Sequence, residues 1–239
     1  MKFNELINRT RNQHFISQAE QRLNSCSSYS DSKNAKINCF EILEKNPPEV
    51  RLIKKNFIKN NLSFHHLFTL KRFLENKNYN LEKLFGRYEE EIQNRVESLL
   101  EFFSIARKEC GVNLERIDLN KIKGFKFEEL LRDLKYIYKC KLMNGLRNPH
   151  RIKETLKEYQ CHLDHVFDDE QALEIYLGLE FKNCSESKRI CDEFKVSKEE
   201  YKQWIRLLLL FLYPQKNGST ILDNYVENLF HEKKFIPIL

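Results

Sequence analysis

Hydrophobic residues recur every three or four positions through most of the chain after residue 80. In NLEKLFGRYEEEIQNRVESLLEFFSIARKE, residues 80–109, the apolar positions include Leu84, Tyr88 and Ile92 and form one continuous face. This period is typical of an amphipathic helix, and Asn80 is a suitable N-cap. The sequence therefore predicts one long helix over this stretch.

The same period predicts further helices along the rest of the chain. KFEELLRDLKYIYKCKLMNGLRNP should form a helix that ends near Gly145, with Pro149 beyond it. Four more are predicted, over residues 151–162, 170–179, 198–213 and 221–232. The apolar run LLLLFLY, between Arg206 and Pro214, indicates a buried helix that stops at the proline. It is far shorter than the ~20 residues needed to cross a bilayer, so we expect no membrane association.

Signals for β-structure are few and lie near the N-terminus. SSYSDSKNAK, residues 27–36, predicts a loop, INCFEIL predicts a short strand, and NPPE then breaks it. One more short strand is expected near the start. The predicted fold is a mainly α helical bundle with a small β element near the N-terminus. We expect a main domain over residues 1–165 and a helical C-terminal extension over 166–239, packed on the same core.

Composition and the absence of known motifs disfavour several classes of protein but do not identify the function. The 41 Lys and Arg residues against 35 Asp and Glu give a net charge of +6, which permits contact with phosphates but does not require it. The seven cysteines include no CxxC pair, and the first residues lack the apolar core of a secretory signal, so we expect reduced thiols and a cytoplasmic location. Since no GxxxxGK[ST], GxGxxG or GxSxG motif occurs, an ATPase, a Rossmann dehydrogenase or an α/β-hydrolase is disfavoured.

The stretch RTRNQHFISQAEQRLN, residues 9–24, concentrates hydrogen-bonding side chains. If it is helical, His14, Gln18 and Arg22 lie along one stripe. Amides and guanidinium groups suit phosphates or base edges, because they present several donors at fixed geometry. The alternative is that these residues cap the helix and form a solvated face.

Arg9 and His14 in this stretch are separated by four residues. Their spacing resembles the R-x4-H motif of the higher-eukaryote-and-prokaryote nucleotide-binding ribonucleases. The resemblance implies that the arginine binds the scissile phosphate and that the histidine performs acid–base chemistry without a metal.

A second basic cluster, KCKLMNGLRNPHRIKETLK, lies at residues 139–157. Arg147, His150 and Arg151 surround Pro149, where one helix should end and the next begin. An anion would be attracted by these side chains and by the free N–H groups of a helix start. The alternative is a basic helix end that satisfies the preceding carbonyl groups.

One segment carries residue types that bind metals. CHLDHVFDDE contains Cys161, His162, His165 and Asp169, and zinc accepts sulfur, nitrogen and oxygen ligands. No second ligand pair at a zinc-site spacing occurs elsewhere, so this is the weaker alternative. We expect neither a metal nor a cofactor.

The quoted segments together resemble a bacterial family catalogued as domain of unknown function 4238, whose members carry NxH[FY][IV]PQ and later an LRTPxxR-like segment. The residues that correspond to these motifs over about 10–155 are Asn12, His14, Phe15, Ile16, Gln18, Leu146, Arg147, Asn148, Pro149 and Arg151. Ser17 and Asn148 depart from the family pattern, which indicates a divergent branch. The resemblance implies a single site formed by the opening motif and the Arg-Asn-Pro junction.

These observations support three hypotheses of different classes. The first is a nucleic-acid-directed effector, such as a nuclease, in a bacterial defence or toxin system, acting on RNA or DNA. In it His14, Arg147 and Arg151 are catalytic, and the substrate is bound by Arg9, Asn12, Gln18, Arg22, Asn148 and His150. The second is a non-catalytic adaptor of a defence complex, partnered for example with an ATPase through an apolar patch around residues 204–213. The third gives the polar motif a purely structural role.

Overall fold

The computed structural model describes residues 3–7, 10–26, 35–71, 78–110, 124, 126–162 and 185–231. Within these ranges the chain is mostly helical, with short antiparallel strand pairs near the N-terminus, so the coarse fold prediction is confirmed. The helix predicted over 170–179 and the boundary near residue 165 lie outside the described residues. No helix in the described ranges has both the length and the apolar character needed to span a bilayer.

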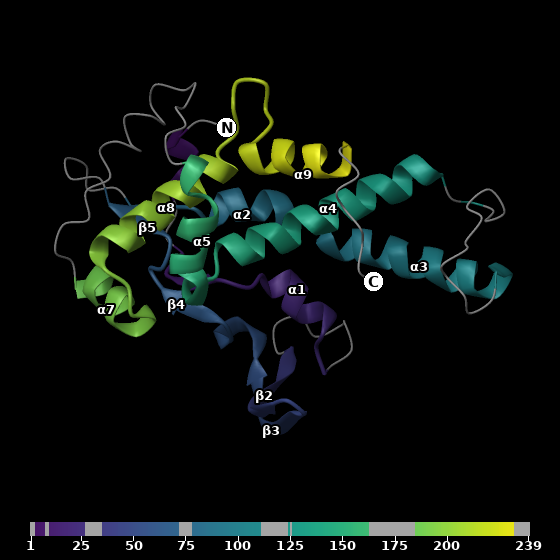
Figure 1. Ribbon diagram of the computed structural model, residues 1–239, viewed down its shortest axis with the longest axis horizontal. Coiled ribbons are helices and arrows are strands. Elements are labelled where there is room, and N and C mark those ends of the chain that lie inside the picture. Colours follow the sequence, from purple (N-terminus) through teal and green to yellow (C-terminus); the bar gives the residue numbers. More distant parts are fainter. Residues whose placement is uncertain are drawn as a thin grey trace.

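Two long helices, α3 (Ile92–Cys110) and α4 (Phe127–Leu146), lie side by side and extend beyond the rest of the molecule (Figure 1). α4 also packs against α2 (Glu82–Glu89) and α9 (Ile221–His231). α4 therefore joins three other helices, α2, α3 and α9.

The single helix predicted over 80–109 is wrong, because the chain breaks between α2 and α3. The Asn80 side chain caps the start of α2 by accepting the Glu82 N–H at 3.1 Å. After α2, the N–H of Glu91 donates to the Tyr136 hydroxyl on α4 at 3.1 Å. The break lets α2 and α3 pack their apolar faces independently, although the apolar period runs through both.

The C-terminal helices complete the core. α5 (Ile152–Glu158) packs on α8 (Lys198–Leu212), which begins with a capping box between Ser197 and Glu200. Short 3-10 turns flank α5 at Pro149–Arg151 and Gln160–His162. α7 (Ser185–Phe194), which the sequence analysis missed, also packs on α8.

The apolar surface predicted around residues 204–213 is wrong, since this part of α8 forms the centre of the core. Trp204 is fully buried, and its indole N–H donates to the carbonyl of Leu146 at 2.7 Å. Tyr213 is buried as well. The core is continuous from the N-terminal segment to α9, since one cluster includes Leu6, Phe68, Leu84, Met143, Ile152, Ile190, Leu208 and Leu222.

The N-terminal part is built from strand pairs rather than from the helix considered for residues 9–24. β1 (Asn12–His14) pairs with β4 (Ser63–His65), and β5 (Thr69–Lys71) pairs with β6 (Asn78–Asn80). The helix α1 begins only at Gln18, where Ser17 accepts the N–H of Glu20 at 2.9 Å, and it ends at Leu23. Pairing of β1 with a strand some fifty residues later therefore overrides the local helical pattern.

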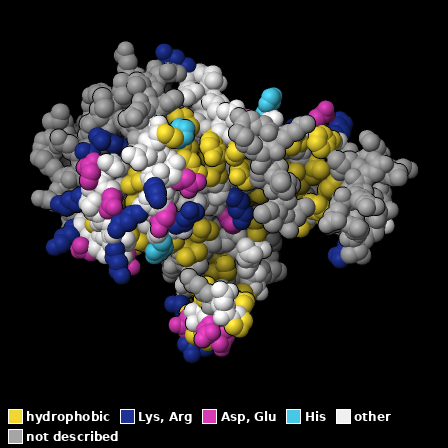
Figure 2. All heavy atoms as spheres, viewed as in Figure 1, with side chains coloured by type: hydrophobic (Ala, Val, Ile, Leu, Met, Phe, Trp, Pro, Cys, Tyr) yellow, Lys and Arg dark blue, Asp and Glu magenta, His cyan; other side chains and the backbone are white. Residues whose placement is uncertain are grey.

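A long hairpin, β2 (Lys36–Lys45) and β3 (Pro48–Phe57), projects from the body (Figure 1). The strand predicted over 37–43 is present, but NPPE does not break the β-structure. Asn46 and Pro47 form the turn, and Pro48 begins the second strand. The projection carries hydrophobic as well as charged side chains (Figure 2).

Candidate functional site: a buried polar centre

His14 lies buried at the end of β1, where a chain of hydrogen bonds fixes its tautomer. Its Nδ1 lies 3.0 Å from the Asn61 carbonyl, so Nδ1 must carry the proton that it donates. The other nitrogen, Nε2, then accepts from the Gln18 amide at 2.8 Å. Gln18 is oriented in turn, because its Oε1 accepts from Arg22 Nη2 at 3.1 Å. The network therefore selects a neutral imidazole with a basic Nε2.

The electrostatic surroundings of His14 favour the same neutral state. Burial lowers the pKa of His14 below its ordinary value of 6.5, against a rise caused by the Asn61 carbonyl. The positive charge of Arg147 lowers this pKa further, and Glu89 raises it. Arg147 and His14, 133 positions apart in the chain, thus lie close enough to interact electrostatically.

Arg147 is the C-cap residue of α4, and its side chain is almost fully buried. Its Nη1 forms an ion pair with Glu89 Oε1 at 2.6 Å, and its guanidinium lies 4.8 Å from the centre of the Phe85 ring. Glu89 and Phe85 are both on α2. Two further guanidinium nitrogens, Nε and Nη2, are buried without a hydrogen-bond partner. A buried arginine with unused donors is suited to bind an anion.

Glu82, on the same face of α2 as Phe85 and Glu89, supplies a carboxyl group with a raised pKa. Burial raises its pKa from 4.5 to about 7, although Arg147 acts in the opposite direction. Its Oε1 is buried without a partner, as are Arg22 Nε and Asn144 Oδ1. Glu82 and His14 each interact electrostatically with both Arg147 and Glu89, so the four groups belong to one site. We call the set His14, Gln18, Arg22, Glu82, Glu89, Asn144 and Arg147 the polar centre.

Contacts between α1 and α4 hold the two halves of the polar centre together. Glu20 on α1 accepts hydrogen bonds from the Asn144 amide and from Lys141, both on α4. At the same junction, the Phe15 ring meets the His150 ring edge-on at 5.8 Å. The opening motif and the Arg-Asn-Pro junction are thus neighbours in the fold.

The remaining residues predicted for substrate binding have other partners. Asn12 donates to the carbonyl of Lys59 at 2.8 Å. Asn148 caps its own turn by accepting the His150 N–H at 3.1 Å. The His150 ring also packs on Phe194, with the ring centres 5.1 Å apart.

Arg151 is placed differently from Arg147, although both were predicted to be catalytic. Its side chain is 53% exposed and lies 4.0 Å from Glu158 in an open ion pair. Arg147 is therefore the only one of the two that belongs to the polar centre. Arg9 lies outside the described residues.

The weaker metal alternative gains no support from the described residues. His165 and Asp169 lie outside them, and His162 packs against the Phe211 ring at 5.2 Å, with Cys161 exposed beside it. Across the part of the chain that the structure describes, no group of three or more His, Cys, Asp or Glu residues is arranged to hold a metal ion.

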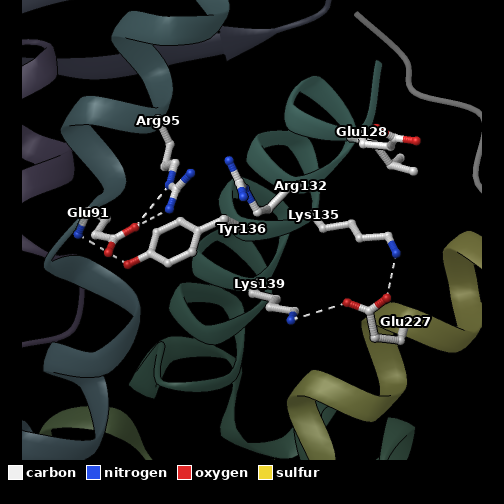
Figure 3. Close-up of a pocket in the computed structure, with 9 residues that line it drawn as sticks. Glu91, Arg95, Glu128, Arg132, Lys135, Tyr136, Lys139 and Glu227 are labelled. Carbon is white, nitrogen blue, oxygen red and sulfur yellow. Dashed lines mark hydrogen bonds and ion pairs between the residues drawn. The ribbon is translucent and has the colours of Figure 1, made fainter. Parts of the chain in front are cut away.

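A charged depression of about 460 Å³ lies apart from the polar centre, between α3, α4 and α9 (Figure 3). Most of its cations are neutralised by neighbouring carboxylates. Arg95 bonds Glu91, and Lys135 and Lys139 lie 2.5 and 3.4 Å from Glu227. Because its charges are already paired, this groove is a weaker candidate for an anion site than the polar centre.

Sequence analysis missed the two carboxylates of α2 and the buried amide of Asn144. A signal was available for the first two. Glu82 and Glu89 are seven residues apart, so they share one face of α2 with Phe85, which is itself buried. Acidic residues on the apolar side of a helix require a partner, and for Glu89 that partner is Arg147.

No family model, curated protein or solved structure matches this chain. The resemblance to domain of unknown function 4238 therefore stays a prediction from the motif residues alone.

Proposed function

We propose that the protein acts on nucleic acid as a metal-independent nuclease, with RNA as its substrate. One observation carries this proposal: a buried Arg147 with two unused donors lies beside a neutral imidazole and a carboxyl group with a pKa of about 7. A phosphate would satisfy the free guanidinium N–H groups. The setting of a bacterial defence or toxin system comes from the resemblance and not from the geometry.

The three groups suit the cleavage of a phosphodiester beside a ribose. His14 Nε2 would accept the proton of the 2′-hydroxyl once Gln18 has moved aside, and the 2′-oxygen would then form a bond to phosphorus. As the bond between phosphorus and the 5′-oxygen breaks, the protonated carboxyl of Glu82 would give its proton to that oxygen. The products would be a 2′,3′-cyclic phosphate and a free 5′-hydroxyl, and Arg147 would stabilise the charge on the phosphoryl oxygens.

Other members of the polar centre hold these groups in place. Glu89 fixes Arg147 through the 2.6 Å ion pair. Gln18 occupies Nε2 of the imidazole in the absence of substrate, and Arg22 holds Gln18 in that orientation. Since Gln18 is only partly buried, it can be displaced without unfolding the site.

The test is incubation of purified protein with total RNA, tRNA and plasmid DNA, with EDTA or with Mg²⁺. We expect cleavage of RNA in EDTA and loss of at least about 100-fold in rate for His14→Asn and for Glu82→Gln. Asparagine keeps a donor for the Asn61 carbonyl but removes Nε2. Arg151→Ala is the matched control and should cleave normally. Full activity in His14→Asn, or cleavage that requires Mg²⁺, would overturn the mechanism.

A non-catalytic adaptor, partnered for example with an ATPase, is the second candidate. The observation that favours it is the exposed apolar surface of the β2–β3 hairpin, where Phe40, Ile42, Val50 and Leu52 are each more than half exposed. An absence of cleavage together with a stable protein complex would support this candidate over the nuclease.

A further inference from the structure

The two faces of the β2–β3 hairpin differ in chemistry. Phe40 lies opposite Leu52 and Ile42 lies opposite Val50, so these four side chains share one face. The pair between them, Glu41 and Arg51, points to the other face and forms an ion pair at 2.5 Å. We call the set Phe40, Ile42, Val50 and Leu52 the outer face.

The outer face points away from the body of the protein. Cys39 and Asn56, which lie on the opposite face, both bond to the side chain of Asn61 in the body. The four outer-face side chains remain 55, 64, 58 and 51% exposed, in the order Phe40, Ile42, Val50 and Leu52. A contiguous apolar patch of this kind on a projecting element is typical of an interaction surface.

The β2–β3 hairpin is only weakly stabilised while its outer face is uncovered. A two-stranded ribbon is at best marginally stable alone, and no third strand among the described residues pairs with either of its edges. Its inner-face contacts with Asn61 hold the base but do not bury the outer face. A partner that covers the four apolar side chains would stabilise the ribbon as well as bind it.

Charge indicates what kind of partner fits. Lys36 and Lys55 lie on the same face as the four apolar residues, nearer the body, since Lys36 pairs with Phe57 and Lys55 pairs with Asn38. Both lysines are exposed. Among the described side chains of this face there is no carboxylate. Glu41 and Glu49 alternate to the opposite face, and Glu44, which follows the register shift after Ile42, pairs with Glu49 and lies there too.

We propose that the outer face binds an amphipathic segment of a partner protein, whose apolar side chains are flanked by carboxylates. The apolar side chains would cover the outer face while the carboxylates meet Lys36 and Lys55. This proposal does not depend on the nuclease function.

The same residues argue against other occupants. A second copy of the chain would bring this face against itself and offer no carboxylate to either lysine. Insertion into a membrane would remove the exposed Glu44 and Glu49, beside the turn, from water. The same two glutamates would repel the phosphates of a nucleic acid.

The experiment measures binding of a labelled helical peptide, about five turns long, with leucine on one side and glutamate on the other, to the full chain. We expect fluorescence anisotropy to show saturable binding that is at least about tenfold weaker for the double variant Ile42→Ser/Val50→Ser. Lys36→Gln/Lys55→Gln should weaken it several-fold. The matched control, Glu41→Gln/Arg51→Gln, changes the opposite face of the same strands and should bind normally. Circular dichroism melts should show that all variants fold.

Several outcomes would overturn the proposal. These are no saturable binding of the glutamate peptide, equal binding of a peptide with lysine in place of glutamate, or equal binding by Ile42→Ser/Val50→Ser. Binding of phosphatidylglycerol vesicles that this double variant abolishes would assign the face to lipid. Concentration-dependent self-association that it abolishes would assign the face to a second copy.

Discussion

The polar centre and the β2–β3 hairpin reverse the usual arrangement of a globular protein. In the polar centre, charged and amide side chains are buried between α1, α2 and the end of α4. In the hairpin, Phe40, Ile42, Val50 and Leu52 are exposed to water. The energetic consequences also differ, since burying a charge is costly unless it is paired, whereas exposing an apolar side chain leaves burial energy unused.

Neither region contributes as much to the stability of the fold as ordinary packing would, and the two depend on the rest of the protein to different degrees. The polar centre depends on the rest of the fold, because its groups are held by hydrogen bonds and ion pairs from three helices and one strand. The outer face of the hairpin has no such dependence, because its four side chains are each more than half exposed. Mutations should therefore affect folding strongly in the first region and binding in the second.

The largest effect is expected for Arg147→Met. This change leaves Glu89 without its partner at a largely buried site, which should lower the free energy of unfolding by about 3–4 kcal/mol. Denaturant unfolding measures the loss. Arg151→Ala, in the exposed pair with Glu158, is the control and should change stability by less than about 0.5 kcal/mol. Equal losses for the two arginines would remove the distinction between a buried and an exposed cation.

A smaller loss is expected for Gln13→Leu beside the polar centre. Gln13 is fully buried, its amide donates to Thr69 Oγ1 at 3.0 Å, and its carbonyl accepts the Phe68 N–H at 2.5 Å. Leucine has a similar size but leaves that N–H unpaired, so the free energy of unfolding should fall by about 2 kcal/mol. Thermal and denaturant melts test this. An unchanged midpoint would show that the interior tolerates the unpaired group.

Glu82→Gln should give an effect of about 1 kcal/mol that depends on pH. The folded pKa of Glu82 is about 7 and its ordinary value is 4.5, so the folded state holds the proton more tightly than the unfolded chain. The wild-type protein should therefore lose stability as the pH rises from about 5 to 7, because the unfolded chain releases this proton first. Glutamine cannot ionise, so the variant should become the more stable one as the pH increases. If the free energies of unfolding of the wild-type protein and the variant changed with pH in the same way across this range, the raised pKa would be contradicted.

The smallest effect on stability is expected for Ile42→Ser/Val50→Ser. Because both side chains are exposed, the free energy of unfolding should change by less than about 0.5 kcal/mol. Equilibrium unfolding in urea gives this value. A loss of 2 kcal/mol or more, on the scale of core substitutions, would mean that the hairpin packs on the body in solution.

Much of the helical fold could be predicted from the period of apolar residues. α4, α8 and α9 begin and end within two residues of their predicted first and last residues, because each buries one well-defined face. The break between α2 and α3 could not, since it depends on where α4 places Tyr136. β3 was missed because two prolines at 47–48 suggest an interruption, whereas the actual pairing places them at the turn and first residue.

The candidate site was predicted only in part. His14, Gln18, Arg22 and Arg147 were selected because polar residues are concentrated around them, and the fold brings them together. Glu82 and Glu89 were missed because, in a sequence, they look like the solvated acids of any amphipathic helix. Their burial is determined by the position of Arg147 at the end of α4, which local patterns do not contain.

Asn61 connects the two regions of this comparison. Its carbonyl accepts the imidazole proton of His14, while its side chain accepts a hydrogen bond from Asn56 at the hairpin base and donates one to Gln21 on α1. A tilt of the ribbon would therefore move the Asn61 carbonyl, whose hydrogen bond affects the electron density of the His14 ring. The His14 carbon and nitrogen resonances should then respond when a peptide docks on strands β2 and β3, which makes this histidine an internal spectroscopic reporter of events at the far end of the ribbon.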